Sequence, residues 1–265
     1  MDSSDLAVER ARYLIDSGRA GEAKKAIEAY CTKPRKAGTN RAATASAEAW
    51  ILWASLVAPN LRKQKNILDR AERTIPIESH PDHMTVLLQL FGAQMKVAEK
   101  ERSNGGGDKE NDNDDDDESE DDEKDDNVLY GTLQKILLLA PKTLEDVRVE
   151  GTGLEFELAD VNGACLACLD HFRTRKGIRG ARSVYNAVLF RSTVALSEEN
   201  QEDVKAFVDR CLEIERDEPG MGWEEKKRIL LKLYNRAMQV FRETPLEGFY
   251  REERNENVVF GDAFA

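Results

Sequence analysis

Three side chains that could bind a metal ion lie close together in the sequence, at Cys165, Cys168 and His171. Thiolate and imidazole are ligands that zinc prefers, and a structural zinc site needs about four of them. Only three are present here, and their spacing places them on one side of an apolar helical pattern. We therefore expect these residues to pack in a helical core. A metal site and a redox-active pair of thiols are the two alternatives.

Two further histidines, His80 and His83, flank Pro81 where a helical pattern begins. They could cap that helix or bind a cation weakly, and the simplest interpretation is a polar first turn. Three histidines in 265 residues are few for acid–base catalysis. The sequence also has no Ser-His-Asp order, no recognisable pair of catalytic carboxylates and no nucleotide-binding fingerprint. We expect no enzymatic activity, no cofactor and no small-molecule substrate.

A dense group of basic residues is the candidate contact for RNA phosphates or an acidic partner segment. Its members are Arg173, Arg175, Lys176, Arg179 and Arg182. The alternative is a solvated surface whose charges compensate the carboxyl ends of helices. Because the chain has no overall basic excess, the RNA interpretation is the weaker functional one.

The net charge of −12 is concentrated in one tract. Residues 108–126 hold fourteen Asp or Glu and two Lys, so the other 37 acidic and 37 basic residues balance. This tract has no apolar side chain to bury, which predicts a disordered acidic insertion at 103–127. It could bind basic protein tails, or it could serve only to increase solubility.

Outside the insertion, apolar residues recur at helical spacing. They predict helix pairs at 5–32 and 45–75, a long helix at 82–102 pairing with 128–141, and helices at 154–172, 181–190, 202–217 and 224–242. The 143–156 segment is ambiguous, and the tail from Thr244 is a capping helix or lies along a neighbour. Trp50 and Trp53, one turn apart, are core residues or a stacking platform.

Two helical segments resemble each other, at Gly180–Phe190 and Arg228–Phe241. Both contain Tyr-Asn within an apolar stripe, at Tyr185 and Tyr234. A weaker copy occurs at Ile67–Ala71. Recurrence of one helical pattern is typical of stacked repeats, so we predict one continuous array made of residues 1–102 and 128–265.

These copies resemble the second helix of HAT (half-a-tetratricopeptide) repeats, and Trp50-x-x-Trp53 is similar to the aromatic pair of the first helix. The resemblance implies an all-α fold in which antiparallel, TPR-like helix pairs stack into a right-handed α-solenoid. Residues implied to pack between repeats are Trp50, Trp53, Ala71, Tyr185, Ala187, Tyr234 and Ala237.

The same resemblance implies a scaffold in a nuclear RNA-processing particle. We expect a nucleolar ribosome-biogenesis role in the U3 small-subunit processome, with protein partners that include WD-repeat subunits. A subunit of an mRNA-processing complex and a direct RNA-binding protein are the alternatives. We expect an intracellular protein, because the cysteines are scattered and the first residues of the sequence are polar and acidic. We expect no membrane span, because the sequence has no long apolar run. The chain begins within a helical pattern, so we expect a fragment.

Overall fold

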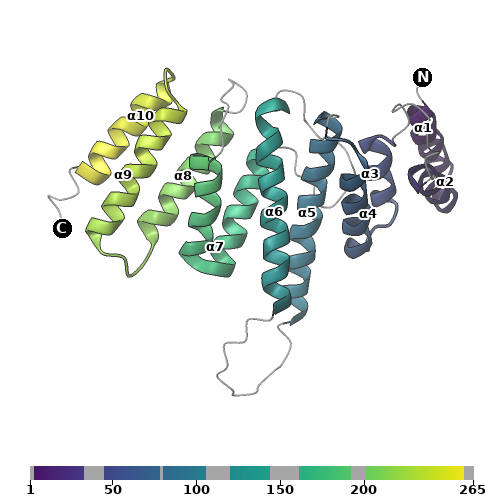
Figure 1. The fold of residues 1–265 in the computed structure, drawn as a ribbon, viewed down its shortest axis with the longest axis horizontal. Coiled ribbons are helices and arrows are strands. Elements are labelled where there is room, and N and C mark those ends of the chain that lie inside the picture. The colour runs from purple at the N-terminus through teal and green to yellow at the C-terminus, as the bar shows by residue number, and fades with distance from the viewer. Residues whose placement is uncertain are drawn as a thin grey trace, which may run out of the picture. The chain divides into compact units, whose positions relative to one another are not determined.

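The computed structural model describes residues 3–32, 45–77, 80–105, 120–143, 161–191 and 201–259. Within these ranges the chain forms ten α-helices and two short π-helical segments, η1 and η2, without a β-strand (Figure 1). The prediction of an all-α fold is confirmed, and the helices pack in neighbouring pairs. The chain divides into two compact units, Met1–Ala164 (unit 1) and Cys165–Ala265 (unit 2), which we describe separately.

Unit 1 contains α1 to α6. Their bounds are Ser3–Asp16, Ala20–Thr32, Ala47–Ser55, Leu61–Thr74, His80–Gly105 and Glu120–Thr143. Helix α1 packs against α2, α3 against α4, and α5 against α6, so the predicted pairing of residues 82–102 with 128–141 is confirmed. Local signals set several ends: Gly18 has the left-handed φ of 74° that closes α1, and the Asn60 side chain accepts a hydrogen bond from the Lys63 N–H to begin α4.

Helix α5 is buried on opposite sides. Val86, Leu90 and Ala93 join a core that also contains buried residues of α1 to α4. Leu88 and Phe91, on the other side of the helix, are fully buried as well. Since both α4 and α6 pack against α5, this helix needs apolar residues around most of its circumference (Figure 1).

The helices extend further into the acidic segment than its composition predicts. Helix α5 continues to Gly105, and α6 begins at Glu120, so only 106–119 of the predicted insertion lies outside the described residues. The favourable position of carboxylates at a helix amino end explains the early start of α6. Packing against α5 then stabilises α6, because the helix propensity of an acidic sequence alone would leave the helix only marginally stable.

Unit 2 begins within α7. The bounds of α7, η1, α8, α9, α10 and η2 are Val161–Tyr185, Asn186–Arg191, Gln201–Asp217, Trp223–Val240, Pro245–Arg254 and Asn255–Val259. Gly177, with a φ of 61°, interrupts α7 where the sequence predicts a break, so two helices meet there. The tail forms a helix, α10, which packs against α9. Residues 144–160, which include the ambiguous segment, lie outside the described residues.

Gly180 follows this break at a position with no room for a side chain. A Cβ there would clash with the backbone carbonyl oxygen of Phe172 and lie 2.8 Å from the Lys176 Cβ. Gly131, within α6, has nothing within 4 Å of the same added atom.

We expect Gly180→Ala to lower the free energy of unfolding by about 1–3 kcal/mol, because the backbone of the preceding helix must move. We expect Gly131→Ala to raise it by up to about 1 kcal/mol, because alanine favours the helix. Urea denaturation followed by circular dichroism compares the two variants. Equal stabilisation by both would contradict the close approach at Gly180.

Candidate partner-binding surfaces

Cys165 and Cys168, for which the sequence predicts core packing, lie in the core of unit 2. Cys165 and Cys168 are buried, and the described residues contain no group of three or more His, Cys, Asp or Glu side chains placed to hold a metal ion. Burial also raises the pKa of the Cys211 thiol, and nearby Cys165 raises it further. Burial of both motif cysteines favours the packing interpretation.

His83 joins the end of α4 to the start of α5. Its side chain is buried, and Nδ1 lies 3.0 Å from the carbonyl oxygen of Ile75. The carbonyl can only accept, so Nδ1 carries the hydrogen in this bond. His83 thus satisfies a carbonyl at the carboxyl end of α4. The His80 side chain lies outside the described residues.

The predicted basic patch is divided by ion pairs within unit 2. Arg173 lies 2.6 Å from Glu218, and Arg182 pairs with Glu215. Lys176 and Arg179 are exposed, and the Lys176 ammonium lies 5.6 Å from the ring centroid of Phe172. Arg175 is half-buried. Two of the five proposed contacts are therefore used to hold α7 against α8 and the residue that follows α8.

A buried carboxylate, Glu215 of α8, is the centre of this network. It is 0% exposed and accepts two hydrogen bonds of 2.8 Å from Arg182 and one of 2.6 Å from the Tyr185 hydroxyl. Burial and the bond to Glu215 raise the pKa of Tyr185. The hydrogen bond to Glu215 also raises the pKa of Arg182.

The second Tyr-Asn copy makes an equivalent contact. The Tyr234 hydroxyl of α9 lies 3.3 Å from Glu253 of α10, and Arg216 of α8 donates to both groups, with 2.8 Å to the carboxylate. In each copy, the tyrosine bonds a glutamate on the next α-helix. We call these contacts the tyrosine–glutamate joints. The similarity of the two segments therefore extends from sequence to hydrogen bonding.

The residues implied to pack between repeats are all buried. This holds for Trp50, Trp53, Ala71, Tyr185, Ala187, Tyr234 and Ala237. The Trp50 and Trp53 ring centroids are 5.6 Å apart and the rings are tilted by 34°. Burial of both rings favours a core role over a stacking platform.

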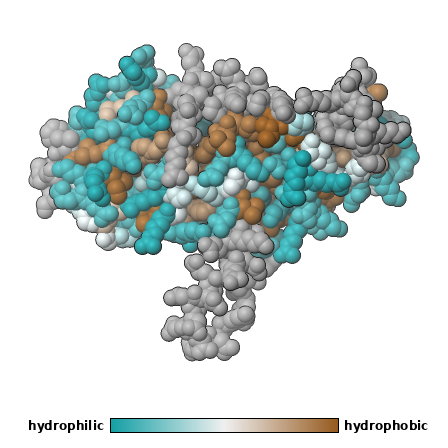
Figure 2. Space-filling view, in the orientation of Figure 1, coloured by the Kyte–Doolittle hydropathy of each residue, from teal (hydrophilic) through white to brown (hydrophobic). Residues whose placement is uncertain are grey.

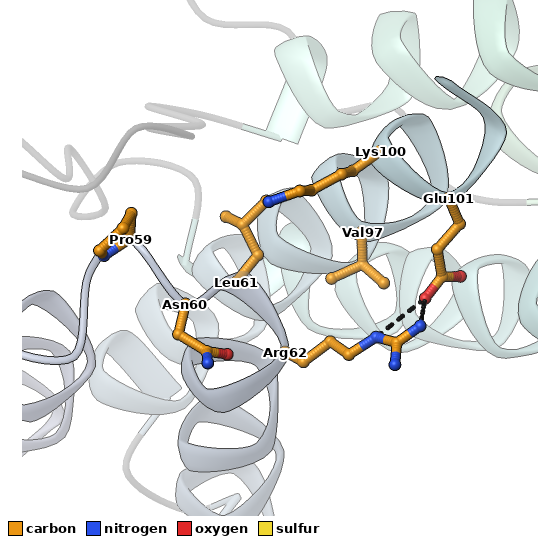
Figure 3. Close-up of a pocket in the computed structure, with 7 residues that line it drawn as sticks. All are labelled: Pro59, Asn60, Leu61, Arg62, Val97, Lys100 and Glu101. Carbon is orange, nitrogen blue, oxygen red and sulfur yellow. Dashed lines mark hydrogen bonds and ion pairs between the residues drawn. The ribbon is translucent and has the colours of Figure 1, made fainter. Parts of the chain in front are cut away.

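An open groove of about 490 Å³ lies between α4 and α5 in unit 1. Figure 3 shows Leu61 and Val97 as its apolar lining, while Arg62 reaches Glu101 at the rim. The Arg62–Glu101 distance is 2.7 Å. An apolar floor with a charged rim suits a protruding side chain of another protein.

Grooves also lie between the helices of unit 2. One of about 510 Å³ lies between α8 and α10 and includes Arg210, Phe249 and Glu253. Two others flank α9, with volumes of about 220 and 560 Å³. Across the face drawn in Figure 2, hydrophilic and hydrophobic residues are interspersed over the described surface. The helix pairs thus offer several mixed surfaces for contact.

Comparison of the chain with protein-family models, with curated proteins and with solved structures found no match. Among the described residues, no helix has both the length and the apolar character needed to cross a membrane. The sites above are therefore interpreted from their own geometry.

Proposed function

We propose that this chain is a non-enzymatic scaffold that binds partner proteins along its helix pairs. The observation that carries this proposal is the series of grooves between neighbouring helices, lined by both apolar and charged side chains. Such grooves accept extended segments or amphipathic helices, whose side chains fill the floor while polar groups meet the rim.

We further infer that the pairs belong to a HAT-like, right-handed α-solenoid. The two tyrosine–glutamate joints support this, because each uses the same motif residue to bond the helix that follows. Arrays of this kind gain stability from contacts repeated between neighbours. They also present long surfaces for several partners.

The resemblance to HAT repeats supports a role in a nucleolar ribosome-biogenesis particle. Within that family, the chain looks most like the C-terminal part of the U3 small nucleolar RNA-associated protein 6 group. This would place it in the small-subunit processome, beside WD-repeat subunits, during maturation of ribosomal RNA. The proposed localisation is the nucleolus.

Affinity purification of the tagged chain from cells tests the proposal. We expect a defined set of protein subunits, including WD-repeat proteins and U3 small nucleolar RNA, and we expect direct protein partners to remain after ribonuclease treatment. Free tag is the control. Recovery of mRNA-processing subunits would move the chain to another HAT complex. Complete loss of partners with ribonuclease would instead favour direct RNA binding.

A further inference from the structure

Helix α9 carries an exposed polar stripe. Its members are Arg228, Lys232, Asn235 and Gln239, continued by Arg242 just after the end of the helix, and all five are exposed. Their spacing of three or four residues places them on one face of the helix. Buried Leu230, Leu233 and Ala237 lie on the opposite side, where the helix packs. The stripe is therefore the solvent face of α9.

A groove follows each side of this stripe. The groove toward η1 is lined by Asn186 and Phe190 together with Arg228 and Lys232 of α9. The groove toward α10 is lined by Asn235 and Gln239 of α9, by Arg242 after its end, and by side chains of α10. These two grooves and the stripe between them form one surface, which we call the α9 surface.

The two copies of the repeat motif place the same residue in these grooves. Asn186 directly follows buried Tyr185, and Asn235 directly follows buried Tyr234. Each asparagine lines one groove. A carboxamide both donates and accepts hydrogen bonds, so it can bond the N–H and the C=O of an extended peptide. The Asn235 oxygen already accepts a bond of 3.2 Å from Arg254.

The α9 surface is basic in a chain of net charge −12. Its lining includes Arg182 and Arg251, but these pair with Glu215 and Glu247 at 2.8 and 2.6 Å. The remaining charged lining residues are Arg228, Lys232, Arg242, Arg254 and Glu225. The nearest carboxylate to Arg242 is that of Glu243, at 3.6 Å in an exposed pair that contributes little. A positive excess therefore remains on this face.

The aromatic residues of the α9 surface favour a peptide over RNA. The Lys232 ammonium lies 4.5 Å from the centroid of the Phe190 ring, and Tyr185 is buried and bonded to Glu215. Single-stranded RNA binding relies on exposed rings on which bases stack. Paired amides beside isolated cations instead match a peptide backbone with acidic side chains.

We propose that the α9 surface binds an extended acidic segment of a partner protein. This inference rests on the proposed scaffold function and names the chemistry of one partner. Asn186 and Asn235 would bond the peptide backbone at two points along the segment. Arg228, Lys232, Arg242 and Arg254 would meet its carboxylates.

Fluorescence anisotropy with a labelled peptide of Asp, Glu, Gly and Ser tests the proposal on the full chain. We expect Lys232→Glu with Arg242→Glu to weaken binding about tenfold at low salt, because two favourable charge contacts become repulsive. The matched control is Arg10→Glu with Lys25→Glu, which makes the same change in net charge at exposed sites of unit 1. It should retain most of the affinity.

A second pair of substitutions separates the amides from the charges. Asn186→Ala with Asn235→Ala should weaken binding about fivefold while leaving the salt dependence nearly unchanged, because hydrogen bonds to the peptide are lost and the net charge of the surface stays the same. Circular dichroism checks that all variants fold. Loss of affinity in the control equal to that in the α9 variant would overturn the proposal. So would tighter binding of labelled oligouridylate than of the peptide.

Purification from cells distinguishes this inference from the scaffold proposal. If the native chain recovers partners but does not bind the acidic peptide, only the assignment of the α9 surface fails. If the chain binds the peptide but recovers no protein partner, the scaffold proposal fails instead. Under both proposals, the Lys232→Glu, Arg242→Glu chain loses one acidic partner and keeps others.

Discussion

Replacing Glu215 with alanine should lower the free energy of unfolding of unit 2 by about 3–5 kcal/mol. The carboxylate is fully buried and accepts bonds from Arg182 and Tyr185. Removing it leaves a half-buried guanidinium and a buried hydroxyl without their acceptor, and this unpaired charge is the main cost. Urea denaturation followed by far-ultraviolet circular dichroism measures the change.

Glu213→Ala is the matched control. This side chain is 55% exposed and pairs with Arg210 on the same helix, so its loss should cost less than about 1 kcal/mol. Replacing Glu215 and Arg182 with methionine and Tyr185 with phenylalanine should recover most of the lost stability, because no unpaired polar group then remains. If Glu215→Ala behaved like Glu213→Ala, the joint would contribute little to the fold.

The second large effect is expected at Trp50. Trp50→Ala should lower the free energy of unfolding of unit 1 by about 3–5 kcal/mol, because it opens a large cavity in a packed core. The side chain is 0% exposed and packs beside Trp53. Urea denaturation followed by far-ultraviolet circular dichroism measures the effect.

Trp50→Phe should cost much less than Trp50→Ala. Among the described residues the indole Nε1 has no hydrogen-bond partner, so phenylalanine loses volume but no polar contact. Tyr13→Ala is the surface control, since Tyr13 is 69% exposed. If Trp50→Ala lowered the free energy of unfolding as little as Tyr13→Ala does, the tryptophan pair would contribute little to the stability of the core.

Local signals in the sequence predicted most helix boundaries. Gly177 and Gly220 lie between predicted helices, and each adopts a positive φ because glycine has no Cβ to oppose that conformation. The Asn60 side chain, which caps the start of α4, is an equally local signal. Helix boundaries of this kind depend on a few neighbouring residues, so they can be predicted from a single sequence.

Contacts between distant residues were not predictable in the same way. Glu215 lies 33 residues after Arg182, and in the sequence it was only one acid in a polar run. The early start of α6 depends on packing against α5 as well as on the carboxylates at its amino end. The repeated Tyr-Asn motif is the one sequence signal for the tyrosine–glutamate joints. It identifies the tyrosine of each joint but does not predict which glutamate the tyrosine bonds.

The two joints have different boundaries. Glu215 is neutralised by an arginine from the helix that carries the tyrosine, whereas Glu253 takes Arg216 from α8, one helix before α9. The second joint is therefore shared by α8, α9 and α10. A chimera cut between α8 and α9 would separate Arg216 from its glutamate, and a cut between α7 and α8 would separate Glu215 from Arg182. Gene duplication or module shuffling can therefore copy this part of the chain only as one block from α7 to α10.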